Sequence, residues 1–174
     1  FIANSSSLVV QGILGAKTLD DLKEAANQIT NLITLLHRNG TKVAMIGRLV
    51  QELNAKLFEK AWSLIASPEL QKYSCLFVMG SEGRGEQILK TDQDNGLIIA
   101  NDYEINAEVV SACEQFSAAL IQFGYPECPG KIMVNNPAWR MSEKDFTETA
   151  KNWLLEPTDR KSTRLNSSHI PLSR

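Results

Sequence analysis

The chain has 174 residues, 43% of them hydrophobic and 22% charged, which is enough for one domain with a sizeable core. Its 18 basic and 20 acidic residues give a net charge of −2, which argues against nucleic acid or an anionic membrane as partner. The three cysteines include no C-x-x-C pair, which favours reduced thiols in a cytoplasmic protein over disulfides or a zinc site. No apolar run approaches the roughly 20 residues needed to cross a bilayer.

The last stretch, DRKSTRLNSSHIPLSR over residues 159–174, has no apolar periodicity and is unlike the sequence before it. It resembles the in-frame translation of a common sequencing-library adapter, so we interpret it as an added, non-native tail that makes no contact with the core. Without it, 14 basic and 19 acidic residues remain, a net charge of −5. Because Phe1 is not a start methionine, we interpret the chain as a fragment at both ends.

The first half of the chain predicts helices. Residues 1–17 are expected to be the weakly structured end of an upstream linker. Thr18 and Asp21 then have the spacing of a capping box, and apolar residues follow at steps of three and four. A second amphipathic pattern runs over residues 46–64 after a short connection. Residues 18–70 are therefore predicted to form an antiparallel helical hairpin.

From residue 71 to residue 158 the pattern becomes that of an α/β structure. Short apolar runs bounded by glycine predict strands, and a 3.6-residue period ended by Gly124 predicts a helix. In chain order we expect strands at Ser74–Met79 and Gly96–Ala100, a helix at Ile105–Phe123, a strand at Lys131–Val134 and a helix after Ser142. The predicted fold is α/β: a small mixed β-sheet with flanking helices, preceded by the helical hairpin and truncated at its C-terminal side.

The segment VMGSEGRGEQILKTDQDNGLII, residues 78–99, lies between the first two predicted strands. Three familiar glycine loops do not match it. A phosphate loop would need Lys and Ser/Thr where Glu86 and Gln87 stand, and a dinucleotide loop would need glycine at Ile88. A calcium loop that starts at Asp92 would need glycine at Leu97.

A metal and triphosphate site fits this segment better. A strand that ends at Gly80 allows close approach of a ligand, and a helix that starts at Ser81 would direct free N–H groups at a phosphate. Arg84, one turn later, could bind a phosphate oxygen with its planar guanidinium. On an extended backbone, Asp92 and Asp94 point to the same side, where two carboxylates suit Mg²⁺ or Mn²⁺. The sequence therefore predicts a site for a metal-bound NTP.

These residues also carry a family resemblance. Gly80-Ser81, followed by Asp92-x-Asp94 and an apolar strand, resembles the core motif of the DNA polymerase β-like nucleotidyltransferase superfamily. The longer strings GSEGRGEQ, KTDQDNGLII and CPGKIMVNNPAWRMS resemble the DUF294 nucleotidyltransferase domain, which is similar to the catalytic domain of the PII uridylyltransferase. The resemblance implies transfer of a nucleotidyl group from ATP or UTP to a hydroxyl acceptor. It also implies that Asp92 and Asp94 are catalytic metal ligands and that Gly80, Ser81 and Arg84 hold the triphosphate.

The resemblance further implies a cytoplasmic signal-transduction protein in which CBS and cyclic-nucleotide-binding-like domains accompany this one and an unknown regulatory protein is the acceptor. One departure bears on activity. Many superfamily members carry a third carboxylate on a later strand, but the strand expected over residues 131–136 offers Asn135 and Asn136. Either Glu127 or Asp145 replaces that carboxylate, or the domain is a weak enzyme or an inactive nucleotide sensor.

Two further alternatives stay open in the sequence. Asn135, Asn136 and Arg140 could contact the base or the ribose of a nucleotide, or this stretch could be no more than the exit of a strand beside a buried Trp139. The helical hairpin could also belong to a protein-interaction module, but that interpretation leaves the glycine-serine turn and the two aspartates unexplained.

Overall fold

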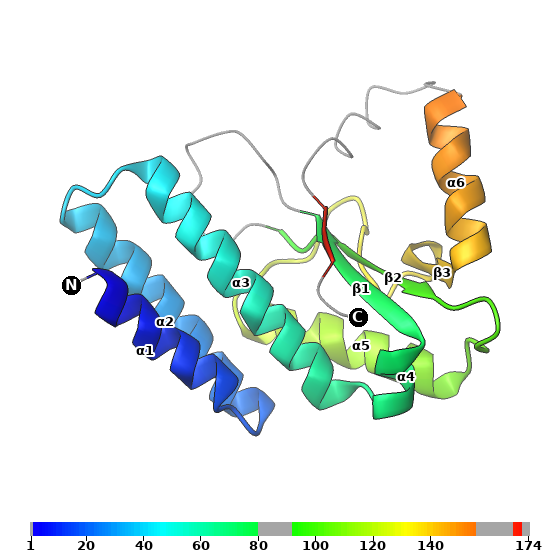
Figure 1. Ribbon diagram of the computed structural model, residues 1–174, viewed down its shortest axis with the longest axis horizontal. Helices are drawn as coiled ribbons and strands as arrows, with labels where there is room; N and C mark the ends of the chain where they lie inside the picture. Colours follow the sequence, from blue (N-terminus) through cyan, green and yellow to red (C-terminus); the bar gives the residue numbers. More distant parts are fainter. Residues whose placement is uncertain (1, 80–91, 156–168, 172–174) are drawn as a thin grey trace.

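The computed structural model describes residues 2–79, 92–155 and 169–171 (Figure 1). It confirms an α/β fold in which a small mixed sheet is flanked by helices. No helix within these ranges is long and apolar enough to cross a membrane. In chain order, the elements are α1 (Ile2–Leu14), α2 (Leu19–Arg38), α3 (Val43–Ile65), α4 (Pro68–Lys72), β1 (Ser74–Met79), β2 (Asn95–Ile99), α5 (Ala107–Gln122), the 3-10 helix η1 (Pro137–Trp139), β3 (Arg140–Ser142), α6 (Glu143–Leu155) and β4 (His169–Pro171).

The predicted hairpin of helices is present as α2 and α3, and a third helix, α1, packs against it. The expectation that residues 1–17 are weakly structured is wrong, because α1 packs against both α2 and α3. Val9 and Ile13 on α1 are buried in the core. Their spacing of four residues is helical, but the run of three serines before Val9 and the glycines at positions 12 and 15 weaken that signal in the sequence.

The predicted start of α2 is confirmed in detail. The Thr18 hydroxyl accepts a hydrogen bond from the Asp21 N–H at 3.2 Å, and the Asp21 carboxylate accepts one from the Thr18 N–H at 3.1 Å. This capping box satisfies two N–H groups that have no partner within the helix. Backbone N–H donors, first from Lys17 and then from Thr18, lower the pKa of Asp21.

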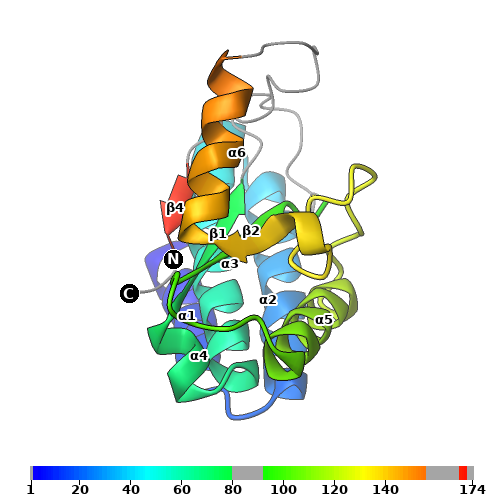
Figure 2. The same ribbon diagram turned by 90° about the vertical axis from the view of Figure 1, so that its right-hand side faces the viewer.

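The sheet has the order β3-β2-β1-β4, with β1 antiparallel to β2 and β3 parallel to β2. Leu76 lies opposite Leu97, and both are buried in the main core. The next pair along the strands, Phe77 and Gly96, must then point to the other face, because side chains alternate along a strand. Figure 2 shows that α6 lies against this second face, and the ring of Phe77 contacts that of Phe146 on α6.

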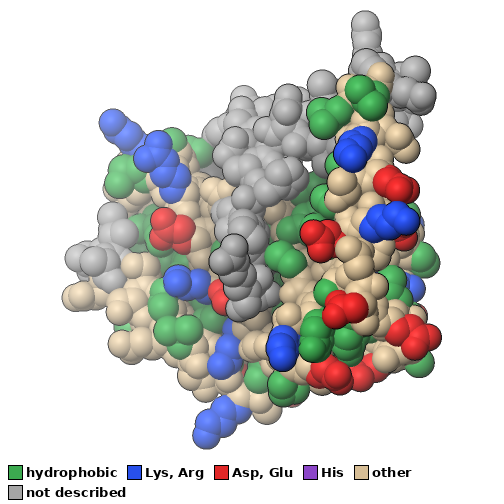
Figure 3. Space-filling view, turned by 45° about the vertical axis from the view of Figure 1, so that its right-hand side comes forward, with side chains coloured by type: hydrophobic (Ala, Val, Ile, Leu, Met, Phe, Trp, Pro, Cys, Tyr) green, Lys and Arg blue, Asp and Glu red, His purple; other side chains and the backbone are tan. Residues whose placement is uncertain are grey.

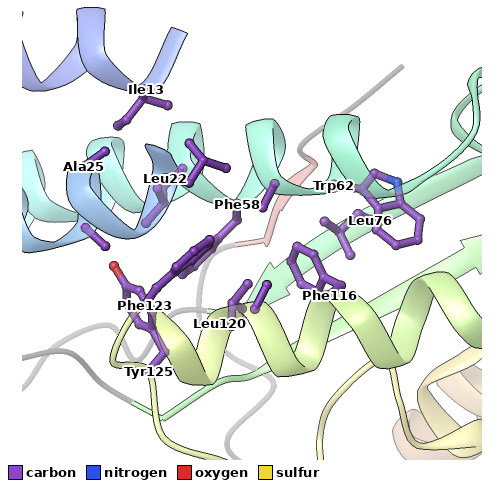
Figure 4. Packing of buried hydrophobic residues seen from close by; sticks show 14 of the residues in the cluster. Ile13, Leu22, Ala25, Phe58, Trp62, Leu76, Phe116, Leu120, Phe123 and Tyr125 are labelled. Atoms are coloured by element: carbon purple, nitrogen blue, oxygen red, sulfur yellow. The ribbon is translucent and has the colours of Figure 1, made fainter. Parts of the chain in front are cut away.

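The main core lies between the sheet and helices α3 and α5. Aromatic residues on α3 meet partners from α5 and the segment after it (Figure 4). The rings of Trp62 and Phe116 meet edge to face at 5.7 Å, and those of Phe58 and Tyr125 do so at 4.9 Å. This packing joins the helical layer to the sheet in one hydrophobic cluster.

The predicted third strand is misplaced. Residues 131–136 are irregular, with a turn at residues 134 and 135, and the strand that pairs parallel with β2 is β3, which starts at Arg140. Lys131 has a φ of +55°, a left-handed conformation that interrupts an extended strand. Asn136 then caps η1 through its side chain, which accepts a hydrogen bond from the Ala138 N–H. The chain therefore leaves the edge of β2 after residue 134 and returns to it at residue 140.

The C-terminal segment also differs from expectation. His169–Pro171 form β4, which pairs antiparallel with Phe77–Met79 of β1. The expected lack of contact between residues 159–174 and the core is therefore wrong for these three residues. The interpretation of the segment as an adapter-derived tail stays a prediction.

Candidate functional site

The end of β1 meets the two aspartates at the start of β2. The Met79 N–H donates a hydrogen bond to the carbonyl oxygen of Asp94 at 2.8 Å, which continues the β1–β2 ladder by one residue beyond Asn95. Met79 is also the residue before Gly80 in the sequence. The last described residue before the glycine-serine segment therefore lies opposite Asp94.

Side chains alternate strictly over residues 92–95. Gln93 and Asn95 are buried, whereas Asp92 is exposed and Asp94 is half-buried. The Gln93 amide nitrogen donates hydrogen bonds to the carbonyl oxygens of Ser117 and Tyr125, which lie on the core side of the sheet. The aspartates consequently alternate with amides that point into the protein, as expected for an extended backbone.

Asp94 has a close neighbour that sequence reasoning did not identify. The thiol of Cys128, which is only 1% exposed, lies close to the Asp94 carboxylate. Burial raises the pKa of this thiol, and its interaction with Asp94 raises the pKa further. The thiol is therefore protonated at neutral pH and can donate to the carboxylate. Cys128 begins the string CPGKIMVNN, which carries part of the family resemblance, but no residue spacing in that string indicates a contact between Cys128 and Asp94.

The loop that carries Cys128 runs along the free edge of residues 93–95. The Gln93 N–H donates to the carbonyl of Pro126 at 2.9 Å, and the Asn95 N–H donates to that of Ile132 at 3.0 Å. The Asn95 side-chain oxygen accepts a hydrogen bond from the Val134 N–H at 2.9 Å. These bonds attach the loop to the aspartate segment at three points.

The residues expected to contact a base or ribose organise the end of this loop. One guanidinium nitrogen of Arg140 donates to the carbonyl oxygens of Val134 and Asn135 at 3.2 and 3.0 Å. The Asn136 amide donates to the carbonyl of Lys131 at 2.9 Å. Asn135 has an exposed side chain. The side chains of Arg140 and Asn136 therefore stabilise this loop through bonds to its backbone. A role of Asn135, Asn136 and Arg140 in nucleotide contact stays a prediction.

The predicted phosphate-binding residues Gly80, Ser81 and Arg84 lie outside the described residues. The two candidates for a third carboxylate lie inside them, and both are exposed. Glu127 forms an ion pair with Lys131 at 3.4 Å, and the Asp145 N–H donates to the Ser142 hydroxyl in the first turn of α6. Charged side chains of both signs are interspersed with hydrophobic ones on the face that carries α6 (Figure 3).

The residues present are compatible with a divalent metal. Asp92 and Asp94 supply hard oxygen donors on the side of the strand away from the core, which is the donor type that Mg²⁺ and Mn²⁺ prefer. Within residues 2–79, 92–155 and 169–171, no group of three or more His, Cys, Asp or Glu side chains is placed to hold a metal ion. A two-carboxylate site suits a metal that is shared with substrate phosphates, because Mg²⁺ usually keeps water and phosphate ligands.

The comparison with protein families is decisive. Residues 27–160 match the family model described as "Putative nucleotidyltransferase DUF294". This chain belongs to the DUF294 family. The match covers α2 from residue 27, all of α3 to α6, both aspartates and the loop that carries Cys128. No curated protein and no solved structure matched the chain. DUF294 membership indicates nucleotidyl transfer as the general class of activity and an NTP as the general class of substrate.

Proposed function

We propose that this DUF294 domain transfers a nucleotidyl group from ATP or UTP to a hydroxyl group on a regulatory protein. In this reaction the acceptor oxygen forms a bond to the α-phosphorus, the bond from that phosphorus to the α–β bridging oxygen breaks, and pyrophosphate and the hydroxyl proton leave. The observation that carries the proposal is the pairing of Met79 with Asp94, because it puts the residue before the glycine-serine segment opposite one of the two aspartates.

Asp92 and Asp94 are the proposed ligands of Mg²⁺ or Mn²⁺, and Gly80, Ser81 and Arg84 are the proposed triphosphate contacts. Bound metal would neutralise charge on the phosphates and assist the attacking hydroxyl. Cys128 would hold the Asp94 carboxylate by donating a hydrogen bond to it. The family resemblance further supports a cytoplasmic signalling protein with CBS and cyclic-nucleotide-binding-like domains.

A second candidate function is nucleotide sensing without turnover. In the described part of the chain, the strand that pairs parallel with β2 is Arg140–Ser142, which carries no carboxylate. A third carboxylate would position or deprotonate the acceptor hydroxyl, and an amide such as Asn135 is a poor base. A domain that holds a metal-bound NTP but lacks such a base would act as a sensor.

Calorimetric titration with ATP and UTP tests the part that both functions share. We expect binding with Mg²⁺ and little binding in EDTA, because Asp92 and Asp94 repel a bare triphosphate and a shared cation bridges them. Asp94→Asn should weaken the binding. Asp102→Asn is the matched control, since Asp102 is an exposed aspartate beyond the other end of β2. Equal affinity with Mg²⁺ and with EDTA would contradict the proposed site.

A further inference from the structure

We propose that Gln93 and Asn95, the buried amides that alternate with the two aspartates, are positioning residues for the metal site. They hold residues 92–95 in the register that turns Asp92 and Asp94 away from the core. This inference rests on the proposed function, because it concerns the residues proposed there as metal ligands. The inference assigns a role in that site to two residues, Gln93 and Asn95, whose side chains point away from it.

Gln93 attaches the segment to helix α5 and to the chain that follows this helix. The residue is 3% exposed, and its amide nitrogen lies 3.1 Å from the carbonyl oxygen of Ser117 and 3.3 Å from that of Tyr125. Its backbone N–H also donates to the carbonyl of Pro126. Three hydrogen bonds from this residue therefore reach α5 and the chain that follows it.

Asn95 attaches the same segment to the loop that carries Cys128. Asn95 is 1% exposed. Its backbone N–H donates to the carbonyl of Ile132, and its side-chain oxygen accepts a hydrogen bond from the N–H of Val134. The loop in turn places the Cys128 thiol against Asp94. Asn95 therefore helps to fix the position of Asp94 in two ways: as its neighbour in the chain, and by holding the loop that carries Cys128.

The position of these amides explains why apolar residues do not stand there. Strand β2 begins only at Asn95, so Asp92 and Gln93 lie before the regular ladder that would fix their register. A shift by one residue would turn the carboxylates into the core and would break the hydrogen bonds of both amides. An apolar side chain could fill the same space. It has no hydrogen bonds to lose, however, so it would favour the observed register over the shifted one less strongly.

The amides are not explained by stability alone. Each has one side-chain polar atom that is buried and has no hydrogen-bond partner among the described residues: the oxygen of Gln93 and the nitrogen of Asn95. Such atoms carry a desolvation cost that an apolar side chain of similar size avoids. This saving offsets part of the loss of the amides' hydrogen bonds, so replacement by an apolar residue should affect the site more than it affects the fold.

Manganese binding tests this inference in the full chain. Electron paramagnetic resonance would measure the affinity for Mn²⁺ in the presence of ATP for the wild type, Gln93→Met and Asn95→Leu. We expect about 10- to 100-fold weaker Mn²⁺ binding in both variants, the range typical when residues that orient a metal ligand are removed. The control is Asn106→Ala, which removes an asparagine side chain that accepts the Val109 N–H at 3.1 Å at the start of α5.

Asn106→Ala should bind Mn²⁺ within about twofold of the wild type, because loss of a helix cap alone does not reach the aspartates. Circular dichroism would show whether each variant is folded. If Asn95→Leu does not fold, Mn²⁺ binding by Gln93→Met tests the inference alone. Wild-type affinity in the folded variants would overturn this inference and leave the proposed function intact. Failure of the wild type to bind Mn²⁺ with ATP, or binding that Asp94→Asn does not weaken, would overturn both.

Discussion

The ring of Phe77 lies across Gly96, its partner on the neighbouring strand, and leaves no room there for a side chain. A Cβ atom on Gly96 would be 2.3 Å from Cζ and 2.7 Å from Cε1 of that ring. Phe146 on α6 packs against the same ring, with the centroids 5.5 Å apart and the planes inclined by 62°. Gly96 is two residues after Asp94, so this aromatic packing supports the strand beside the aspartates on the same face of the sheet.

Substitution of Gly96 should therefore destabilise the fold. Gly96→Ala places a methyl group inside the contact distance of a ring that Phe146 holds from the other side, so the ring or the strand must move. We expect the free energy of unfolding to fall by about 1–3 kcal/mol, the usual cost of overpacking. Urea unfolding measures this change.

Gly47→Ala is the matched control for that substitution. Gly47 lies exposed in helix α3, and a Cβ there meets nothing within 4 Å. The same change should raise the free energy of unfolding by about 0.5–1 kcal/mol, because alanine favours the helix over glycine. In a Phe77→Leu background, Gly96→Ala should cost less. A neutral Gly96→Ala, or the same cost in that background, would contradict the role assigned to the ring.

Thiol labelling tests the burial of the cysteines. Burial raises the pKa of Cys113 to about 12 and raises that of Cys75 and Cys128. A raised pKa means less thiolate at a given pH than in a free cysteine, and the thiolate is the species that reacts. With a disulfide reagent at pH 8, the native protein should therefore label slowly and only at half-buried Cys75.

The rate of that labelling should increase as the pH rises toward 9 and above, and all three thiols should react at once in denaturant. Cys75→Ser is the control, because it should remove the slow native reaction and leave two thiols to react after unfolding. Fast labelling of Cys128 in the native protein would contradict its placement against Asp94.

The central part of the fold was predictable because its signals are local. The strand Ser74–Met79 was predicted with the bounds that the structure has, and the second strand was displaced by one residue. Short apolar runs bounded by glycine allow few other structures at these positions. The burial of Gln93 and Asn95 agrees with the alternation expected for Asp92 and Asp94, whose proposed metal binding stays a prediction.

The parts that the sequence did not predict depend on contacts between distant residues. The side chain of Gln93 donates hydrogen bonds to carbonyls 24 and 32 residues further along the chain. No spacing in the sequence predicts contacts between residues so far apart. Residues 131–134 have the composition of a strand, but the left-handed backbone at Lys131 and the hydrogen bonds of Asn136 give a loop. Pairing with β2 then starts only at Arg140.

Deletion of residues 159–174 tests their interpretation as a tail. His169–Pro171 form only a three-residue strand at the edge of the sheet, next to β1. If these residues are an added tail, the native fold does not depend on β4, and the deletion should change the free energy of unfolding by less than about 0.5 kcal/mol. Thermal and urea unfolding of the shortened chain measure it. A loss of about 2 kcal/mol would identify β4 as part of the native sheet.

The choice between a transferase and a sensor requires a measurement of chemistry. Both functions use Asp92 and Asp94 to hold a metal-bound NTP, so binding alone does not separate them. Transfer also requires stabilisation of the charge that develops in the transition state, so Asp94→Asn should reduce turnover more than it reduces nucleotide affinity.

The test is to incubate the protein and its cell lysate with ATP or UTP labelled at the α-phosphate, and to measure label on protein. A transferase predicts label with the wild type, none with Asp94→Asn, and unchanged label with Asp102→Asn. The Asp102 control matters because it removes the same charge beyond the other end of β2. Binding that depends on Mg²⁺ without label in any sample would favour the sensor, and would agree with the lack of a carboxylate on Arg140–Ser142, the strand that pairs parallel with β2 in the described part of the chain. Equal, non-zero label with the wild type and Asp94→Asn would contradict the role of Asp94 in transfer.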